Sequence, residues 1–93
     1  MYYVEFCDYE THFTSLTDAI KACVHEMKLH DYYNVIEIYK DRDSRRPSGY
    51  VQTNGLHYFY VTFYKRRKTA RRLDDNGNFI QPAVNRLSAK RRY

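Results

Sequence analysis

One stretch of this chain can form little other than a β-strand. Residues 56–64 read Leu-His-Tyr-Phe-Tyr-Val-Thr-Phe-Tyr, a run dense in aromatic and β-branched side chains with no Gly or Pro. Directly after it, residues 65–72 place six Lys or Arg side chains in eight positions. The pattern predicts a long strand that leads into a basic surface.

Alternation divides this strand into two faces. One face carries His57, Phe59, Val61 and Phe63, and the other carries Tyr58, Tyr60, Thr62 and Tyr64. The first face has no obligatory polar atoms except those of the histidine, so we predict that it packs in the core. The second face would then lie open or beneath a C-terminal segment.

Three shorter stretches alternate as strands: residues 2–9, 33–40 and 50–53. The pair Asn54-Gly55 suits a two-residue hairpin turn between the last of these and the long strand. Such a turn would set Thr53 opposite Leu56 and Val51 opposite Tyr58. Residues 10–12 read as a turn or as the frayed end of the first strand.

Residues 16–30 predict a helix. Ser15 suits the N-cap, and the apolar stripe of the helix consists of Leu16, Ile20, Cys23 and Met27. A short C-terminal helix could start at Pro82, with the stripe Ile80, Val84 and Leu87.

The order β-α-β-β-β, with room for the short C-terminal helix, predicts an α+β fold in which one helix packs on a small, mostly antiparallel sheet. The 93 residues are enough for one domain, residues 1–93, with a basic C-terminal extension from about residue 65.

Charge is divided unevenly along the chain. Residues 1–40 hold seven acidic residues and three lysines, a net charge of −4, whereas residues 41–93 hold four acidic residues and thirteen Lys or Arg, a net charge of +9. A basic half of this kind meets an anion, most commonly nucleic acid. The loop that contains Arg42, Arg45 and Arg46 together with Asp41 and Asp43 is expected to be solvated.

We therefore expect a non-enzymatic protein that contacts nucleic acid, DNA or RNA, or a nucleoprotein complex, through the basic run beside a tyrosine-rich sheet face. That face would hold Tyr3, Tyr9, Tyr39, Tyr58, Tyr60 and Tyr64, which could stack unpaired bases. The candidate binding residues are Lys65, Arg66, Arg67, Lys68, Arg71, Arg72, Tyr58, Tyr60, Tyr64, Arg86, Lys90 and Arg91.

Two alternatives stay open. Small tyrosine-rich phage or mobile-element proteins block a host nucleic-acid enzyme by binding it, as anti-CRISPR proteins do, and this chain is similar to them in general style, without a shared motif. The other alternative is a metal-free RNase toxin. It would use His57, Tyr60, Arg67 and Tyr93 to stabilise the charged transition state.

Several classes are not expected. His25 and His30 are five residues apart and fall on different sides of a helix, so we predict no metal site, and no motif indicates a cofactor. No apolar stretch reaches the ~18 residues of a membrane span. The N-terminal residues do not resemble a signal peptide, and two cysteines suit reduced thiols, so we expect a cytoplasmic protein. An exposed edge at residues 2–9 or 50–53 could pair with a second copy, which leaves a homodimer open.

Overall fold

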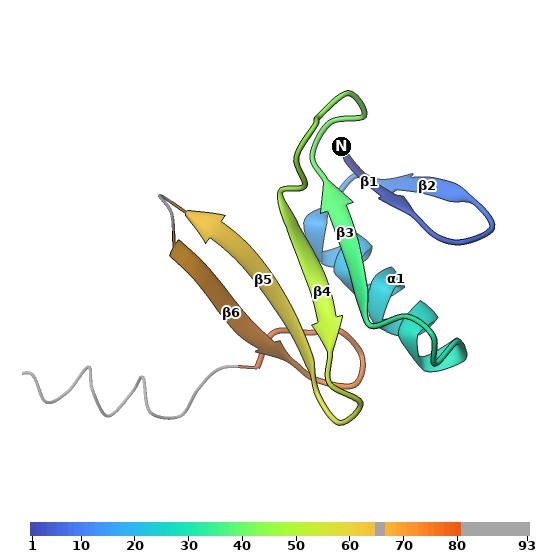
Figure 1. Cartoon of the computed structure of the whole chain (residues 1–93), viewed down its shortest axis with the longest axis vertical. Coiled ribbons are helices and arrows are strands. Elements are labelled where there is room, and N and C mark those ends of the chain that lie inside the picture. The colour runs from blue at the N-terminus through green and yellow to red at the C-terminus, as the bar shows by residue number, and fades with distance from the viewer. Residues whose placement is uncertain (65–66, 81–93) are drawn as a thin grey trace, which may run out of the picture.

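The computed structural model describes residues 1–64 and 67–80. Within them, one helix lies against a six-stranded antiparallel sheet (Figure 1). The elements in chain order are β1 (Tyr2–Glu5), β2 (Glu10–Phe13), α1 (Leu16–Leu29), β3 (Val35–Tyr39), β4 (Gly49–Thr53), β5 (Tyr58–Tyr64) and β6 (Arg67–Leu73). The strands lie side by side in the order β2-β1-β3-β4-β5-β6. The coarse prediction of an α+β fold is confirmed.

The order of elements differs from the predicted β-α-β-β-β in two places. The chain reverses after β1, where the Phe6 N–H donates to the Tyr9 carbonyl at 2.8 Å, so the predicted strand 2–9 ends early and residues 10–13 return as β2. Residues 67–73, expected in a basic extension, form the edge strand β6. A strand at an edge tolerates a run of cations because pairing uses the backbone and the charged side chains stay in water. The predicted helix from Pro82 lies outside the described residues.

The helix forms as the sequence predicts. The Ser15 hydroxyl accepts a hydrogen bond from the Asp18 N–H at 3.1 Å, which satisfies one of the free donors of the first turn. At the other end, the His30 N–H donates to the Glu26 carbonyl. The buried face of α1 consists of Ala19, Ile20, Cys23, Val24 and Met27.

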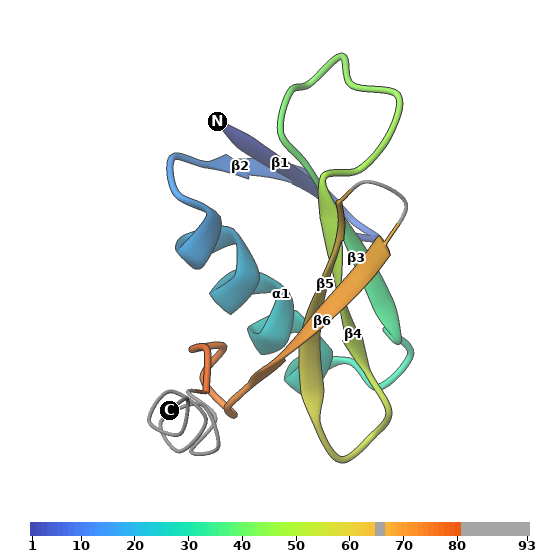
Figure 2. The ribbon, with the colours of Figure 1, turned by 90° about the vertical axis from the view of Figure 1, so that its left-hand side faces the viewer.

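The core lies between α1 and one face of the sheet. Figure 2 shows the helix on one side of the strands only. The sheet contributes the buried side chains of Val4, Phe6, Ile36, Ile38, Val51, Tyr60 and Leu73. As Figure 1 shows, α1 lies behind β1 and β3, while β5 and β6 extend away to the side.

β5 turns the opposite face to the core from the one predicted. Tyr60 is only 5% exposed and belongs to the core, whereas Phe63 is 51% exposed. The hairpin register explains the difference, because Val51 pairs with Tyr60 and cross-strand partners share a face.

The hairpin loop is also longer than predicted. Thr53 lies opposite Tyr58, so the loop spans residues 54–57. The Asn54 side-chain oxygen accepts hydrogen bonds from the N–H groups of Leu56 and His57, at 2.9 and 2.8 Å. These bonds satisfy backbone donors that a two-residue turn would have paired across the strands, which stabilises the longer loop.

A glycine makes room for the buried tyrosine. A Cβ atom at Gly49 would lie 2.5 Å from the Tyr60 hydroxyl oxygen, so only a residue without a side chain fits beneath this ring. Burial raises the pKa of Tyr60, while a hydrogen bond with Ser48 acts in the opposite direction.

Across residues 1–64 and 67–80, no helix has the length and apolar character needed to span a bilayer.

Candidate functional site

The sheet face that α1 leaves uncovered carries a group of aromatic rings on β5 and its neighbours. We call this group the aromatic face, and it consists of Tyr50, His57, Phe59 and Phe63. The rings of Tyr50 and Phe63 are 6.0 Å apart, and those of His57 and Phe59 are 6.4 Å apart. Val61 lies between them on the same strand and is only 4% exposed, because the surrounding side chains cover it. The apolar area that this face exposes is therefore made by the rings themselves.

Two cations from β6 border this surface. Lys68 lies directly opposite Phe63, and Arg72 directly opposite Phe59, so each cation shares the open face with a ring. Arg72 Nη2 is 2.8 Å from His57 Nδ1. A guanidinium has donors only, so Nδ1 is the acceptor in this contact.

The other two cations of β6 project to the opposite side. Arg67 pairs with Tyr64 and Arg71 with Tyr60, which places both on the helix side of the sheet. The Arg71 guanidinium carbon lies 4.0 Å from the centre of the Phe79 ring, a cation–π contact. All four cations are exposed, but they do not form one patch. The remaining predicted cations, Lys65, Arg66, Arg86, Lys90 and Arg91, lie outside the described residues, as does the side chain of Tyr64.

The prediction that Tyr58 and Tyr60 form an open tyrosine face is wrong, because both pack toward the helix. Of the other tyrosines expected there, Tyr3 and Tyr39 do lie on the open face, paired across β1 and β3. Tyr9 is exposed beside the β1–β2 connection, close to Glu26. The tyrosine-rich face is therefore replaced by the aromatic face on β4 and β5.

Sequence reasoning missed Tyr50, Phe59 and Phe63 as surface residues. It also set aside Arg46, which with Pro47 lines a shallow hollow against Phe63. One signal in the sequence pointed to the buried face of β5. Val51 is the one large aliphatic side chain of β4, so the β5 residue opposite it must also face the core.

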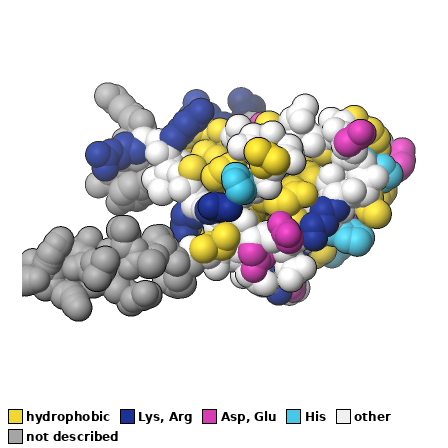
Figure 3. Space-filling view, turned by 90° about the horizontal axis from the view of Figure 1, so that it is seen from below, with side chains coloured by type: hydrophobic (Ala, Val, Ile, Leu, Met, Phe, Trp, Pro, Cys, Tyr) yellow, Lys and Arg dark blue, Asp and Glu magenta, His cyan; other side chains and the backbone are white. Residues whose placement is uncertain are grey.

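The half of the open face over β1 and β3 is acidic. Glu5 and Glu37 are exposed there, and the Tyr39 hydroxyl donates to Glu37 Oε1 at 3.0 Å. This bond to Glu37 raises the pKa of Tyr39. Seen from the lower end of the molecule, several dark-blue Lys and Arg side chains lie toward the β5–β6 side, while magenta acidic side chains lie at the centre and on the right with other dark-blue side chains among them (Figure 3).

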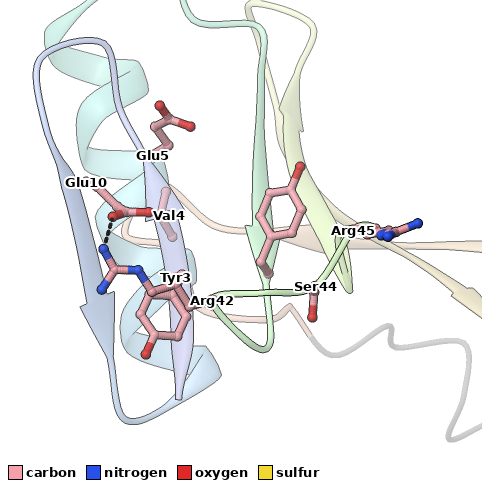
Figure 4. A pocket seen from close by; sticks show the side chains of 8 residues that line it. Tyr3, Val4, Glu5, Glu10, Arg42, Ser44 and Arg45 are labelled. Atoms are coloured by element: carbon pink, nitrogen blue, oxygen red, sulfur yellow. Dashed lines mark ion pairs between the residues drawn. The ribbon is translucent and has the colours of Figure 1, made fainter.

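A hollow lies at the acidic end, between β1, β3 and the 41–48 loop, and encloses about 220 Å³. Figure 4 shows Arg42 reaching toward Glu10, to which it forms an ion pair at 3.5 Å, while Arg45 extends away from them. Its volume is below the ~300–1,000 Å³ of ordinary ligand pockets. Its charges are of both signs, so it does not favour an anionic ligand.

The residues considered for RNA cleavage are not brought together. His57, in the loop before β5, contacts Arg72 on the open face, whereas Tyr60 packs in the core on the helix side. Arg67 is on the helix side, and Tyr93 lies outside the described residues. In the part of the chain that the structure describes, no group of three or more His, Cys, Asp or Glu side chains is placed to hold a metal ion.

No protein-family model, curated protein or solved structure matches this chain.

Proposed function

We propose that this chain binds nucleic acid, through the cations of β6 and the aromatic face beside them, and acts by binding rather than by catalysis. One observation carries the proposal: Lys68 and Arg72 project from β6 onto the same uncovered face as Phe63 and Phe59, each directly opposite one ring. Cations and aromatic rings are the two side-chain types that nucleic acid engages, through its phosphates and its bases.

Electrostatics supports a polyanion as the partner. Each phosphate that a Lys or Arg side chain neutralises releases condensed counterions, which favours binding and makes it salt-dependent. The cations of β6 are exposed, and no ion pair holds them within the described residues. Arg72 contacts His57 Nδ1 and Arg71 lies over the Phe79 ring, so a phosphate competes with these two contacts but with no carboxylate of the described residues.

The test is a paired substitution with a matched control. Lys68→Gln/Arg72→Gln removes the two cations of the aromatic face, and Lys28→Gln/Lys40→Gln removes the same charge from α1 and from the end of β3. Binding of a labelled oligonucleotide of about 12 nucleotides is measured by fluorescence anisotropy at about 50 and 200 mM salt.

We expect Lys68→Gln/Arg72→Gln to weaken binding about tenfold or more at low salt. The slope of log affinity against log salt should fall by about 1.4, which is the value for two lost phosphate contacts to a single strand. The control pair should change affinity by less than about threefold, since it alters only long-range attraction. A wild-type protein that does not bind, or equal losses in the two pairs, refutes the proposal.

A second candidate is a protein that binds and blocks a nucleic-acid enzyme. The acidic half of the open face favours it, because Glu5 and Glu37 would repel phosphate but could pair with a basic protein surface. This candidate predicts one stoichiometric partner that survives nuclease treatment. Glu5→Gln/Glu37→Gln should release that partner while Lys68→Gln/Arg72→Gln retains it, and the reverse pattern contradicts the idea.

A further inference from the structure

We infer that the nucleic acid bound by this protein is single-stranded, and that its bases stack on Phe59 and Phe63. This inference rests on the proposed function and adds the form of the substrate and the position of the bases. It starts from the exposure of Phe63, which leaves 51% of its surface in water. The helix covers only the opposite face of the sheet (Figure 2).

Phe59 and Phe63 lie on the same side of β5. They are four residues apart, so their positions are separated by about 13 Å along the strand. Val61, between them, is only 4% exposed because its neighbours cover it. In the proposed complex one base stacks at each ring, and the nucleotides between them span about 13 Å along β5.

The charges around the rings select the occupant. Lys68 and Arg72 line the β6 side, and Arg46 lies against Phe63 at the end of the face. Glu37, on the β3 side, lies next to Tyr50 in the β3–β4 register and limits the anion to the β5–β6 half. A ligand with apolar planar groups and a regular negative charge fits this pattern, and unpaired nucleotides have both.

A duplex would leave the rings unused. In double-stranded DNA or RNA the faces of the bases are stacked on one another, and a protein surface meets phosphates and groove edges instead. In a single strand the bases are free to stack on aromatic side chains, and each stacked base strengthens binding by about 5- to 150-fold. The aromatic face therefore contributes to affinity only when the bases are unpaired.

The experiment compares two probes and three variants. The probes are a fluorescein-labelled single strand of about 12 nucleotides, made as DNA and as RNA, and a duplex of the same length. Phe59→Leu and Phe63→Leu keep apolar bulk but remove the stacking ring. Tyr32→Leu is the matched control, because Tyr32 is a 56% exposed ring far from β5 in the chain.

We expect the wild-type protein to bind the single strand about tenfold or more tightly than the duplex. Each Phe→Leu variant should lose about fivefold or more for the single strand and keep its affinity for the duplex, and Tyr32→Leu should match the wild type. Photocrosslinking of a 5-iodouracil-containing strand should give an adduct at Phe59 or Phe63. Circular dichroism of each variant confirms that the fold is retained.

The outcomes separate this inference from the proposed function. Equal affinity for both probes, with no effect of the Phe→Leu substitutions but a loss in Lys68→Gln/Arg72→Gln, overturns the inference and keeps the proposed function. No binding of either probe by the wild type overturns both, and would indicate a protein partner for this face.

Discussion

The orientation of β5 can be tested by truncating one residue on each of its faces. Tyr60→Ala removes a ring that is 5% exposed in the core, and Phe63→Ala removes a ring that is about half exposed on the open side. An aromatic side chain buries ~150–250 Å². At ~25 cal/mol per Å², full burial is worth about 4–6 kcal/mol, part of which alanine retains through its Cβ atom.

The two substitutions should differ clearly. Tyr60→Ala also leaves an enclosed cavity, so the free energy of unfolding should fall by about 3–5 kcal/mol. Phe63→Ala loses half the contact area and leaves no cavity, so we expect a loss of about 1–2 kcal/mol. Because a domain of this size has a stability of only ~5–14 kcal/mol, Tyr60→Leu serves as a milder second variant.

Urea unfolding followed by circular dichroism measures the difference. With an m-value of ~1.5 kcal/mol/M, Tyr60→Ala should lower the urea midpoint by about 2–3 M, and Phe63→Ala by about 0.7–1.3 M. If Phe63→Ala destabilises the protein as much as Tyr60→Ala or Tyr60→Leu, β5 presents the other face to the core and the aromatic face does not exist.

Three further predictions concern other parts of the fold. Gly49→Ala should lower the free energy of unfolding by about 1–3 kcal/mol, because the new methyl group would collide with the Tyr60 ring, and unchanged urea stability would contradict this packing. Burial raises the pKa of the Cys23 thiol to about 12, so a thiol reagent should label only the exposed Cys7 in the native protein and both cysteines after denaturation. Rapid labelling of both thiols in the native protein would contradict this. Hydrogen bonds from the Asn78 and Asn76 N–H groups lower the pKa of Asp74, so its contribution to stability is complete above about pH 4 and is lost as the pH falls through the native pKa. Asp74→Ala should therefore destabilise the protein most at neutral pH and progressively less as the pH is lowered below about 4, as followed by urea unfolding at each pH.

The helix was predictable and the face of β5 was not, for different physical reasons. A helix has local signals, and both the Ser15 cap and the 3.6-residue stripe through Ile20 and Cys23 are written in consecutive residues. In β5 both faces are aromatic, so alternation alone could not choose between them. The choice depends on Val51 and Gly49 in the neighbouring strand, and thus on contacts between strands.

Charge hid the last strand in the same way. Arg67–Leu73 has no apolar alternation, so its sequence indicates a solvated extension, and it becomes a strand by pairing with β5. For the candidate site, we predicted the cations of 67–72 beside the tyrosines of β5, whereas two of these cations lie beside Phe59 and Phe63. The prediction assigned these phenylalanines to the core because their side chains have no polar atom. The pattern did not indicate which rings share a face of the sheet with Lys68 and Arg72.

The position of β6 at an edge of the sheet also affects how molecules of this protein behave toward one another. Within the described residues, the outer edge of β6 is paired only at Arg72 and Leu73, by Ile80 and Phe79. The N–H and C=O groups of 67–71 could therefore accept a strand from another molecule. Repulsion between cations on two such edges opposes that addition. Added salt weakens this repulsion, so we expect solubility to fall as ionic strength rises. A bound polyanion would neutralise the same charges. Molecules bound to a polyanion at high concentration would then be the most prone to associate through their β6 edges.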